Sequence, residues 1–227
     1  MDAFRINRRR FLGAGAVGLS AVALPGCDAF DFLGARDGRA RRLMERANDL
    51  TYRAQRLVIG ANGMAREFTE ADIRQPMRPN GVTKPDDPIY SALAAGNFAD
   101  YRLEVSGLVE RPLSLSLDQA GVRPEARYVM FHCLDTIERS LSGEIKYYGS
   151  IDLVDARHPQ TILAYGMNGD RLPIENGAPL RVRVERQLGY KMPKYLRAIH
   201  LVDKLTGVGF GRGGYWEDRG YDWYAGI

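Results

Sequence analysis

Five short runs of apolar residues between residues 101 and 202 indicate a fold built on β-sheet. Apolar and polar residues alternate in Tyr101–Val105, Leu113–Leu117 and Leu180–Val184, as they do in strands that bury one face. Tyr128–Cys133 is a denser apolar run, which suits a strand buried on both faces, and Leu196–Val202 supplies a fifth strand.

Two segments have helical patterns. The spacing of Leu43, Ala47, Leu50, Ala54 and Leu57 predicts a helix from about Arg41 to Ile59. A second helix is expected from His158 to Met167, with Pro159 in its first turn and Asn168-Gly169 at its end. The stretches from Glu67 to Pro88 and from Gly207 to Ile227 are typical of loops. Strands and helices mix without regular alternation, so the sequence predicts an α+β fold.

Residues 1–27 are predicted to be an export signal. The motif Asn7-Arg8-Arg9-Arg10-Phe11-Leu12-Gly13 is a twin-arginine element, and the apolar run Ala14–Leu24 follows it. Twin-arginine signals export folded chains, which indicates a periplasmic protein. Leu24-Pro25-Gly26-Cys27 resembles a lipobox, which would make Cys27 a lipidation site, and Asp28 is typical of retention at the inner membrane. Cleavage without lipid is the alternative.

Residues 28–60 are expected to form a tether and the first, amphipathic helix. The polar face of this helix carries Arg42, Glu45, Arg46, Asp49 and Arg53. Such a helix either lies on a membrane surface or docks on its own domain.

Charge and cysteine content exclude several function classes. Without the charged residues of the predicted signal, 28 basic residues face 27 acidic ones, so the chain lacks the basic excess of a nucleic-acid-binding protein. The two cysteines are Cys27 and Cys133, too few for a disulfide framework. No Gly-x-Ser-x-Gly motif occurs, and the three histidines do not have zinc-ligand spacing.

Two segments have the chemistry of an anion site. Asn176–Arg181 is a turn that leads into a strand, and Gln187–Lys194 is a glycine-containing loop with Lys191 and Lys194 three positions apart. Arginine gives bidentate contacts to phosphate, and lysine acts as a point charge. Both segments could equally be solvated turns.

A wider pattern includes these segments. It runs from Ala156-Arg157-His158-Pro159-Gln160-Thr161 through Met167-Asn168-Gly169 and Asn176-Gly177-Ala178-Pro179-Leu180-Arg181 to Gly213-Gly214-Tyr215-Trp216-Glu217-Asp218-Arg219-Gly220. This pattern resembles the sulfite-oxidase family of molybdopterin oxidoreductases. The match is best with the bacterial exported branch, which includes sulfite dehydrogenases and periplasmic methionine-sulfoxide reductases. The resemblance implies a molybdopterin-binding α+β domain over residues 61–227, with mixed sheets and peripheral helices.

The resemblance also implies the cofactor contacts. Asn80 lies in an upstream pterin loop, Asn176 and Arg181 hold the pterin and its phosphate, and Cys133 stands where a relative carries threonine. The full implied set for molybdopterin is Asn80, Cys133, Asn176, Arg181, Lys191, Met192, Pro193 and Lys194.

One family segment is missing between Gln119 and Ala120. In the family, several dozen residues at this point carry a His-Asp-Cys-Val-Glu-Gly-Trp-Ser type motif whose cysteine thiolate binds molybdenum. The domain is therefore expected to be truncated internally, without that metal ligand, and Cys133 is the one substitute within the domain.

The resemblance implies oxygen-atom transfer at molybdenum, either to sulfite or from a sulfoxide, with electrons exchanged with a cytochrome or a membrane haem partner. Because the metal-binding cysteine is missing, catalysis by this chain is left open. The alternatives are a periplasmic lipoprotein that binds pterin or another anion without catalysis, and a truncated inactive product.

Overall fold

The computed structural model describes residues 39–74, 76–109, 121–141 and 143–226. The signal, the lipobox with Cys27, most of the tether, the expected strand Leu113–Leu117 and the junction at Gln119–Ala120 all lie outside these residues. The chain divides into two compact units, Met1–Arg53 and Ala54–Ile227. The second unit contains both sequence segments with anion-site chemistry.

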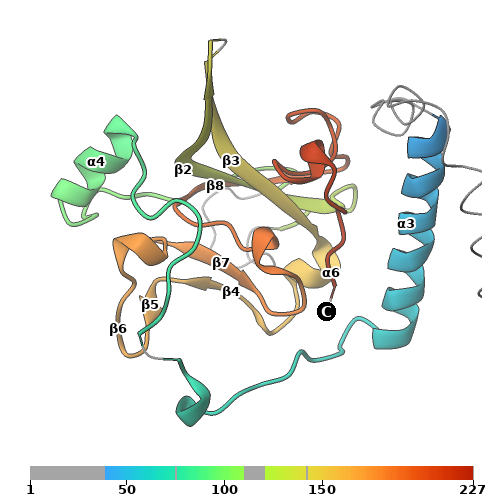
Figure 1. Ribbon diagram of the computed structural model, residues 1–227, viewed down its shortest axis with the longest axis horizontal. Helices are drawn as coiled ribbons and strands as arrows, with labels where there is room; N and C mark the ends of the chain where they lie inside the picture. The colour runs from blue at the N-terminus through green and yellow to red at the C-terminus, as the bar shows by residue number, and fades with distance from the viewer. Residues whose placement is uncertain (1–38, 75, 110–120, 142, 227) are drawn as a thin grey trace, which may run out of the picture. The chain divides into compact units, whose positions relative to one another are not determined.

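A four-stranded mixed sheet forms the centre of the second unit (Figure 1). Its strands are β1 (Glu104–Gly107), β8 (Leu196–Val202), β2 (Tyr128–Ser140) and β3 (Gly143–Asp152), in that order across the sheet. β1 runs parallel to β8, and β2 runs antiparallel to both β8 and β3. With few helices around mixed sheets, the fold is α+β as the sequence predicts.

The pairing of β2 is irregular at one point. Between the pairs His132–Tyr148 and Thr136–Lys146, β2 has three residues where β3 has Tyr147 alone. Such a bulge bends the strand and redirects its side chains. It therefore changes the course of the sheet beside Tyr147.

The predicted helix His158–Met167 is wrong. The segment instead forms β4 (Thr161–Ala164), which pairs antiparallel with β7 (Arg181–Val184), and β5 (Gly166–Met167), which pairs with β6 (Asp170–Arg171). Asn168 and Gly169 have φ of 54° and 85°, the left-handed conformation of a tight hairpin turn. The Asn-Gly pair therefore marks a hairpin and not a helix end.

The core fills the space between the central sheet and β7. Val129, Phe131 and Cys133 of β2 pack with Ile199 and Leu201 of β8 in one apolar cluster. The other members are Val105, Val109, Ala126, Ile151, Val182, Val184 and Leu196. The alternating apolar residues Leu180, Val182 and Val184 thus face this core.

The helices are few. The predicted amphipathic helix is α3 (Arg39–Ile59), and no helix of the described residues is long and apolar enough to span a membrane. The helix α4 (Pro88–Ala95) was not expected from the sequence. Its start nevertheless has two typical signals, because Asp87 accepts a hydrogen bond from the Tyr90 N–H and Pro88 lies in the first turn. The short elements are α6 (Leu153–Ala156), η2 (Glu70–Asp72), η3 (Ile174–Asn176), η4 (Gly189–Lys191) and η5 (Glu217–Arg219).

Within the second unit, Arg56 ties the last turn of α3 to α6. Its guanidinium lies 2.6 Å from Asp152 Oδ2 and 2.8 Å from Asp155 Oδ1, at the start of α6. Leu57 and Val58 beside it are 86% and 85% exposed. An ion pair therefore holds this turn, and its apolar residues do not.

The core assignment predicts the effect of truncating Leu201, which is fully buried on β8. Leu201→Ala should lower the free energy of unfolding by about 2–5 kcal/mol, because it removes buried methyl groups and leaves a cavity. Urea denaturation measures this difference. Leu141→Ala, at a fully exposed position, is the control and should have no measurable effect. Equal losses in the two variants would show that the core is assigned wrongly.

Candidate functional site

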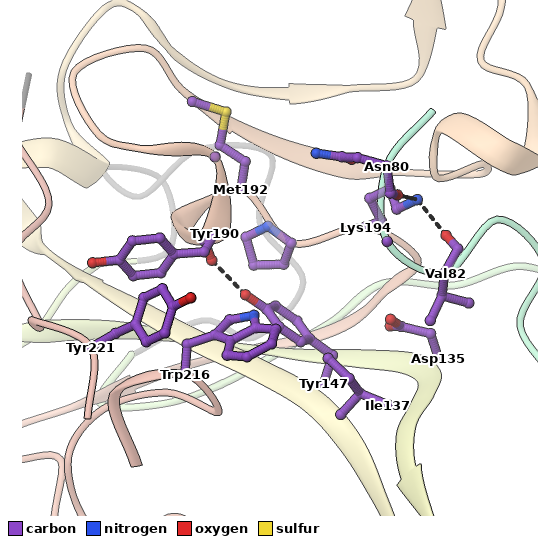
Figure 2. Close-up of a pocket in the computed structure, with 13 residues that line it drawn as sticks. Asn80, Val82, Asp135, Ile137, Tyr147, Tyr190, Met192, Lys194, Trp216 and Tyr221 are labelled. Carbon is purple, nitrogen blue, oxygen red and sulfur yellow. Dashed lines mark hydrogen bonds between the residues drawn. The ribbon is translucent and has the colours of Figure 1, made fainter. Parts of the chain in front are cut away.

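A pocket of about 310 Å³ lies beside the bulge of β2 (Figure 2). Four segments that are distant in sequence supply its walls: the loop at residues 80–82, the two central strands, the η4 loop and the C-terminal tail. The lining residues are Asn80, Gly81, Val82, Asp135, Ile137, Tyr147, Gly189, Tyr190, Met192, Pro193, Lys194, Trp216 and Tyr221.

Lys194 fixes the polar end of the pocket. Its Nζ donates to the main-chain carbonyl oxygens of Asn80 at 2.7 Å, of Glu175 at 3.0 Å, and of Val82. A lysine ammonium has three protons, so these carbonyls match its whole donor capacity. Burial and the charge of Arg181 lower the pKa of Lys194 to about 8, and Asp135 opposes that shift.

Asp135 lies within the bulge and at the same end of the pocket (Figure 2). The residue is 5% exposed, and its Oδ1 atom has no hydrogen-bond partner among the described residues. Burial raises the pKa of the Asp135 carboxyl to about 6. The main-chain N–H of Asp135 and the charges of Lys194 and Lys146 act in the opposite direction and lower this pKa. An unpaired acceptor therefore borders the pocket.

Aromatic rings form the opposite wall (Figure 2). Tyr221 contacts both Tyr190 and Trp216, with ring centroids 5.1 Å and 5.2 Å apart. The Tyr147 hydroxyl donates to the Tyr190 carbonyl oxygen at 2.5 Å. Burial, followed by the charge of Glu217, raises the pKa of Tyr147 and of Tyr190, so both phenols stay neutral at ordinary pH.

Gly177 brings Arg181 next to Lys194. It has a φ of 113°, and a Cβ atom there would lie 2.9 Å from the Lys194 Cβ and 3.3 Å from the Arg181 Cβ. Only glycine fits this position without displacing those side chains. Arg181 Nη1 donates to the main-chain oxygen of Asn176 at 2.9 Å, whereas its buried Nε has no partner among the described residues. Burial and the charge of Arg183 lower the pKa of Arg181.

The structure brings together only part of the residue set implied by the sequence. Asn80, Met192, Pro193 and Lys194 line the pocket. Asn176 and Arg181 do not line it, although Gly177 places Arg181 beside Lys194.

Lys191 and Cys133 lie outside the lining set. The Lys191 Nζ is buried 2.5 Å from Glu217 Oε1, and burial lowers its pKa while Glu217 opposes that shift. Cys133 is 3% exposed within the core, and burial raises the pKa of its thiol. This buried, neutral thiol does not have the environment of a reactive thiolate.

Sequence reasoning missed the carboxylate and the aromatic wall. Asp135 follows the dense apolar run of β2, and an acid directly after such a run is the signal that could have revealed it. Trp216 and Tyr221 lie in a tail rich in Gly, Tyr and Trp that has no periodicity. Within the described part of the chain, no group of three or more His, Cys, Asp or Glu residues could hold a metal ion.

The buried Asp135 carboxyl predicts a pH-dependent stability. Its pKa is about 6 in the folded state and 3.8 as an ordinary value, so the folded state binds the extra proton and loses stability as pH rises through that interval. Asp135→Asn should therefore be more stable than the parent at pH 8 by on the order of 2 kcal/mol, with the difference vanishing near pH 4. Urea unfolding at both pH values measures it. The control Asp203→Asn changes an exposed carboxylate, and an Asp135→Asn effect independent of pH would contradict the expectation.

Comparisons with known proteins identify the domain. Residues 117–207 match the model of the oxidoreductase molybdopterin binding domain. The putative protein-methionine-sulfoxide reductase subunit YedZ1 of Azospira oryzae is 32% identical over 191 residues, which covers 73% of this chain and 69% of that protein. Molybdopterin is the cofactor that this domain binds.

Other relatives share shorter stretches. The protein-methionine-sulfoxide reductase catalytic subunit MsrP of Pseudomonas syringae pv. tomato is 36% identical over 101 residues, covering 41% of this chain. The chain spans only 30% of that protein's length, and 51% of the MsrP protein of Xanthomonas campestris pv. campestris, which is 28% identical.

A solved structure also aligns with the chain. It is the sulfane dehydrogenase SoxCD from Paracoccus pantotrophus, at 22% identity and a TM-score of 0.37, and the alignment covers 46% of this chain and 39% of that one. The domain match and the long alignment with the Azospira relative decide the assignment. The chain belongs to the sulfite-oxidase family of molybdopterin-binding oxidoreductases.

Proposed function

We propose that this chain binds molybdopterin in the pocket beside Asp135 and Lys194 and reduces a neutral sulfoxide. The charge of the pocket is the observation that favours a neutral substrate over an anionic one. Lys194 is the one cation among the lining residues, and its protons are directed at three carbonyl oxygens. An anion such as sulfite would therefore meet Asp135 without a free positive partner, whereas a neutral sulfoxide carries no charge to be repelled.

The described residues fit the organic part of the cofactor. The buried Nε of Arg181 is a donor without a partner, which suits the terminal phosphate, and Asn176 lies beside it. Asn80, Met192, Pro193 and Lys194 would line the pterin, with the aromatic wall opposite. Lys191 and Cys133 would support this site from within the protein and not contact the cofactor.

The chemistry divides between cofactor and protein. When bound, molybdenum on the pterin dithiolene supplies two-electron oxygen-atom transfer. Conversion of a sulfoxide to a thioether takes up two electrons and two protons and releases water. The protein would hold the phosphate of the cofactor through Arg181, and Trp216 and Tyr221 would limit the access of water to the pocket. A haem-containing redox partner would supply the electrons.

Two further parts of the proposal rest on sequence. The twin-arginine motif supports export to the periplasm, and Cys27 supports a lipid anchor at the inner membrane. The missing family segment at Gln119–Ala120 is the second part, and it rests on the family resemblance of the sequence on either side of this junction.

A second candidate function is pterin binding without oxygen transfer. The position of Cys133 favours it, because this thiol is buried in the core and does not line the pocket. Without a protein thiolate, the pterin dithiolene alone would hold the metal.

The experiment is to express the full chain in a host that makes molybdopterin and to measure pterin and molybdenum per mole of folded protein. We expect near-stoichiometric pterin and molybdenum, with reduction of methionine sulfoxide by reduced viologen dye and no oxidation of sulfite by ferricyanide. Pterin without metal or activity would establish the second function. Folded protein without pterin would refute both.

A matched pair of variants tests the phosphate contact. Arg181→Met should lower the pterin content at least tenfold, because the terminal phosphate loses a charge-assisted hydrogen bond. Arg197→Met, on exposed β8 surface, should retain the parent content. Equal pterin content in the two variants would place the phosphate elsewhere.

A further inference from the structure

Asp135 has a buried acceptor that the protein leaves unused. Its Oδ1 atom has less than 1 Å² of exposed surface and no hydrogen-bond partner among the described residues. A buried polar atom without a partner costs about 1–3 kcal/mol, and native proteins keep such atoms rarely. An unused acceptor on the wall of a pocket therefore points to a donor on a ligand.

The nearby cations are engaged elsewhere. Lys194 donates to three main-chain carbonyl oxygens, as described above. The Nζ of Lys146 donates to Asp87 Oδ2 at 2.6 Å and to Thr136 Oγ1 at 2.8 Å. Neither lysine makes a hydrogen bond to Asp135, and the described residues supply no donor to its Oδ1.

The opposite wall defines the shape of the ligand. Tyr190, Trp216 and Tyr221 present aromatic rings across the pocket from Asp135, and Tyr147 lines the pocket from the neighbouring strand (Figure 2). Aromatic side chains stack on flat heterocycles. A flat ring with N–H donors on one edge would satisfy both walls.

We propose that Asp135 recognises the 2-amino-4-oxopyrimidine edge of the pterin by accepting an N–H hydrogen bond at Oδ1. This inference rests on the proposed function and names a contact that the family resemblance does not supply. The acceptor at Asp135 serves the pterin ring, and the unused donor at Arg181 serves the phosphate. A carboxylate is an acceptor only, so it also excludes the phosphate from its own end of the pocket.

The two unpartnered atoms thus give the cofactor a direction. Gly177 keeps Arg181 against Lys194, and Lys194 extends to the loop at Asn80 and Val82. Asp135 is one of the residues that line the pocket, whereas Arg181 is not. The ring would enter the pocket, and the phosphate would remain towards Arg181.

The test measures binding and not turnover. The full chain is purified from a host that cannot make molybdopterin and is titrated with pterin, lumazine and guanine by calorimetry. Lumazine has the same bicyclic ring as pterin with an oxo group in place of the 2-amino group, and guanine has the same edge on a different ring. We expect pterin to bind at least tenfold more tightly than either.

Variants assign the preference to one residue. Asp135→Asn should lower the affinity for pterin about ten- to a hundredfold, because a charged acceptor is lost, and should reduce its advantage over lumazine. Asp203→Asn, an exposed control, should bind as the parent does. Thermal melts show whether each variant is folded, and the comparison of pterin with lumazine in the parent requires no variant.

Several outcomes would overturn the inference. Equal affinity of the parent for pterin and lumazine would do so, as would tighter binding of guanine or full pterin affinity in folded Asp135→Asn. Suppose that the chain purified from a molybdopterin-producing host carries pterin and that one of these three results is also found. The proposed function then stands, and only the inference about Asp135 fails. If that chain carries no pterin and none of the three probes binds, the proposed function fails with it.

Discussion

The irregular pairing of β2 is the constraint on which the pocket depends. Up to His132 the strand is paired on both sides, with β8 and with β3, and its apolar side chains fill the core. Beyond His132 three residues face Tyr147 alone, and the pairing with β8 skips Arg197. This bulge places Asp135 and Tyr147 on the same pocket. The first half of β2 therefore packs in the core, and its second half lines the pocket.

Lys194 completes the site that the bulge opens. It joins the loop at Asn80 and Val82 to the turn at Glu175, segments about a hundred residues apart in sequence. Lys194 is one of the cofactor contacts that the family resemblance implies. In the structure its protons go to carbonyl oxygens, so a phosphate at Lys194 would have to replace one of them. Arg181, with a buried Nε that has no partner among the described residues, can take the phosphate without loosening the loop.

The sequence predicted those features that have a local pattern. Alternating apolar residues located β7, and the dense run at Tyr128 located β2, because each buried face leaves a period of two or a continuous apolar stretch. The helix expected at His158–Met167 was wrong because its Asn-Gly turn closes a hairpin. The pocket was only partly predictable. Asn80 and Lys194 came from family motifs, whereas Asp135 and Trp216 meet through tertiary pairing that no local pattern encodes.

The central claim is that molybdopterin occupies the pocket with its ring at Asp135 and its phosphate at Arg181. The most direct measurement is a crystal structure of the full chain purified from a host that makes molybdopterin. We expect density for a flat ring between the aromatic wall and Asp135, with an N–H edge within hydrogen-bond distance of Oδ1 and a phosphate at the Arg181 guanidinium. Pterin bound elsewhere on the chain, or bound with its phosphate against Asp135, would contradict it.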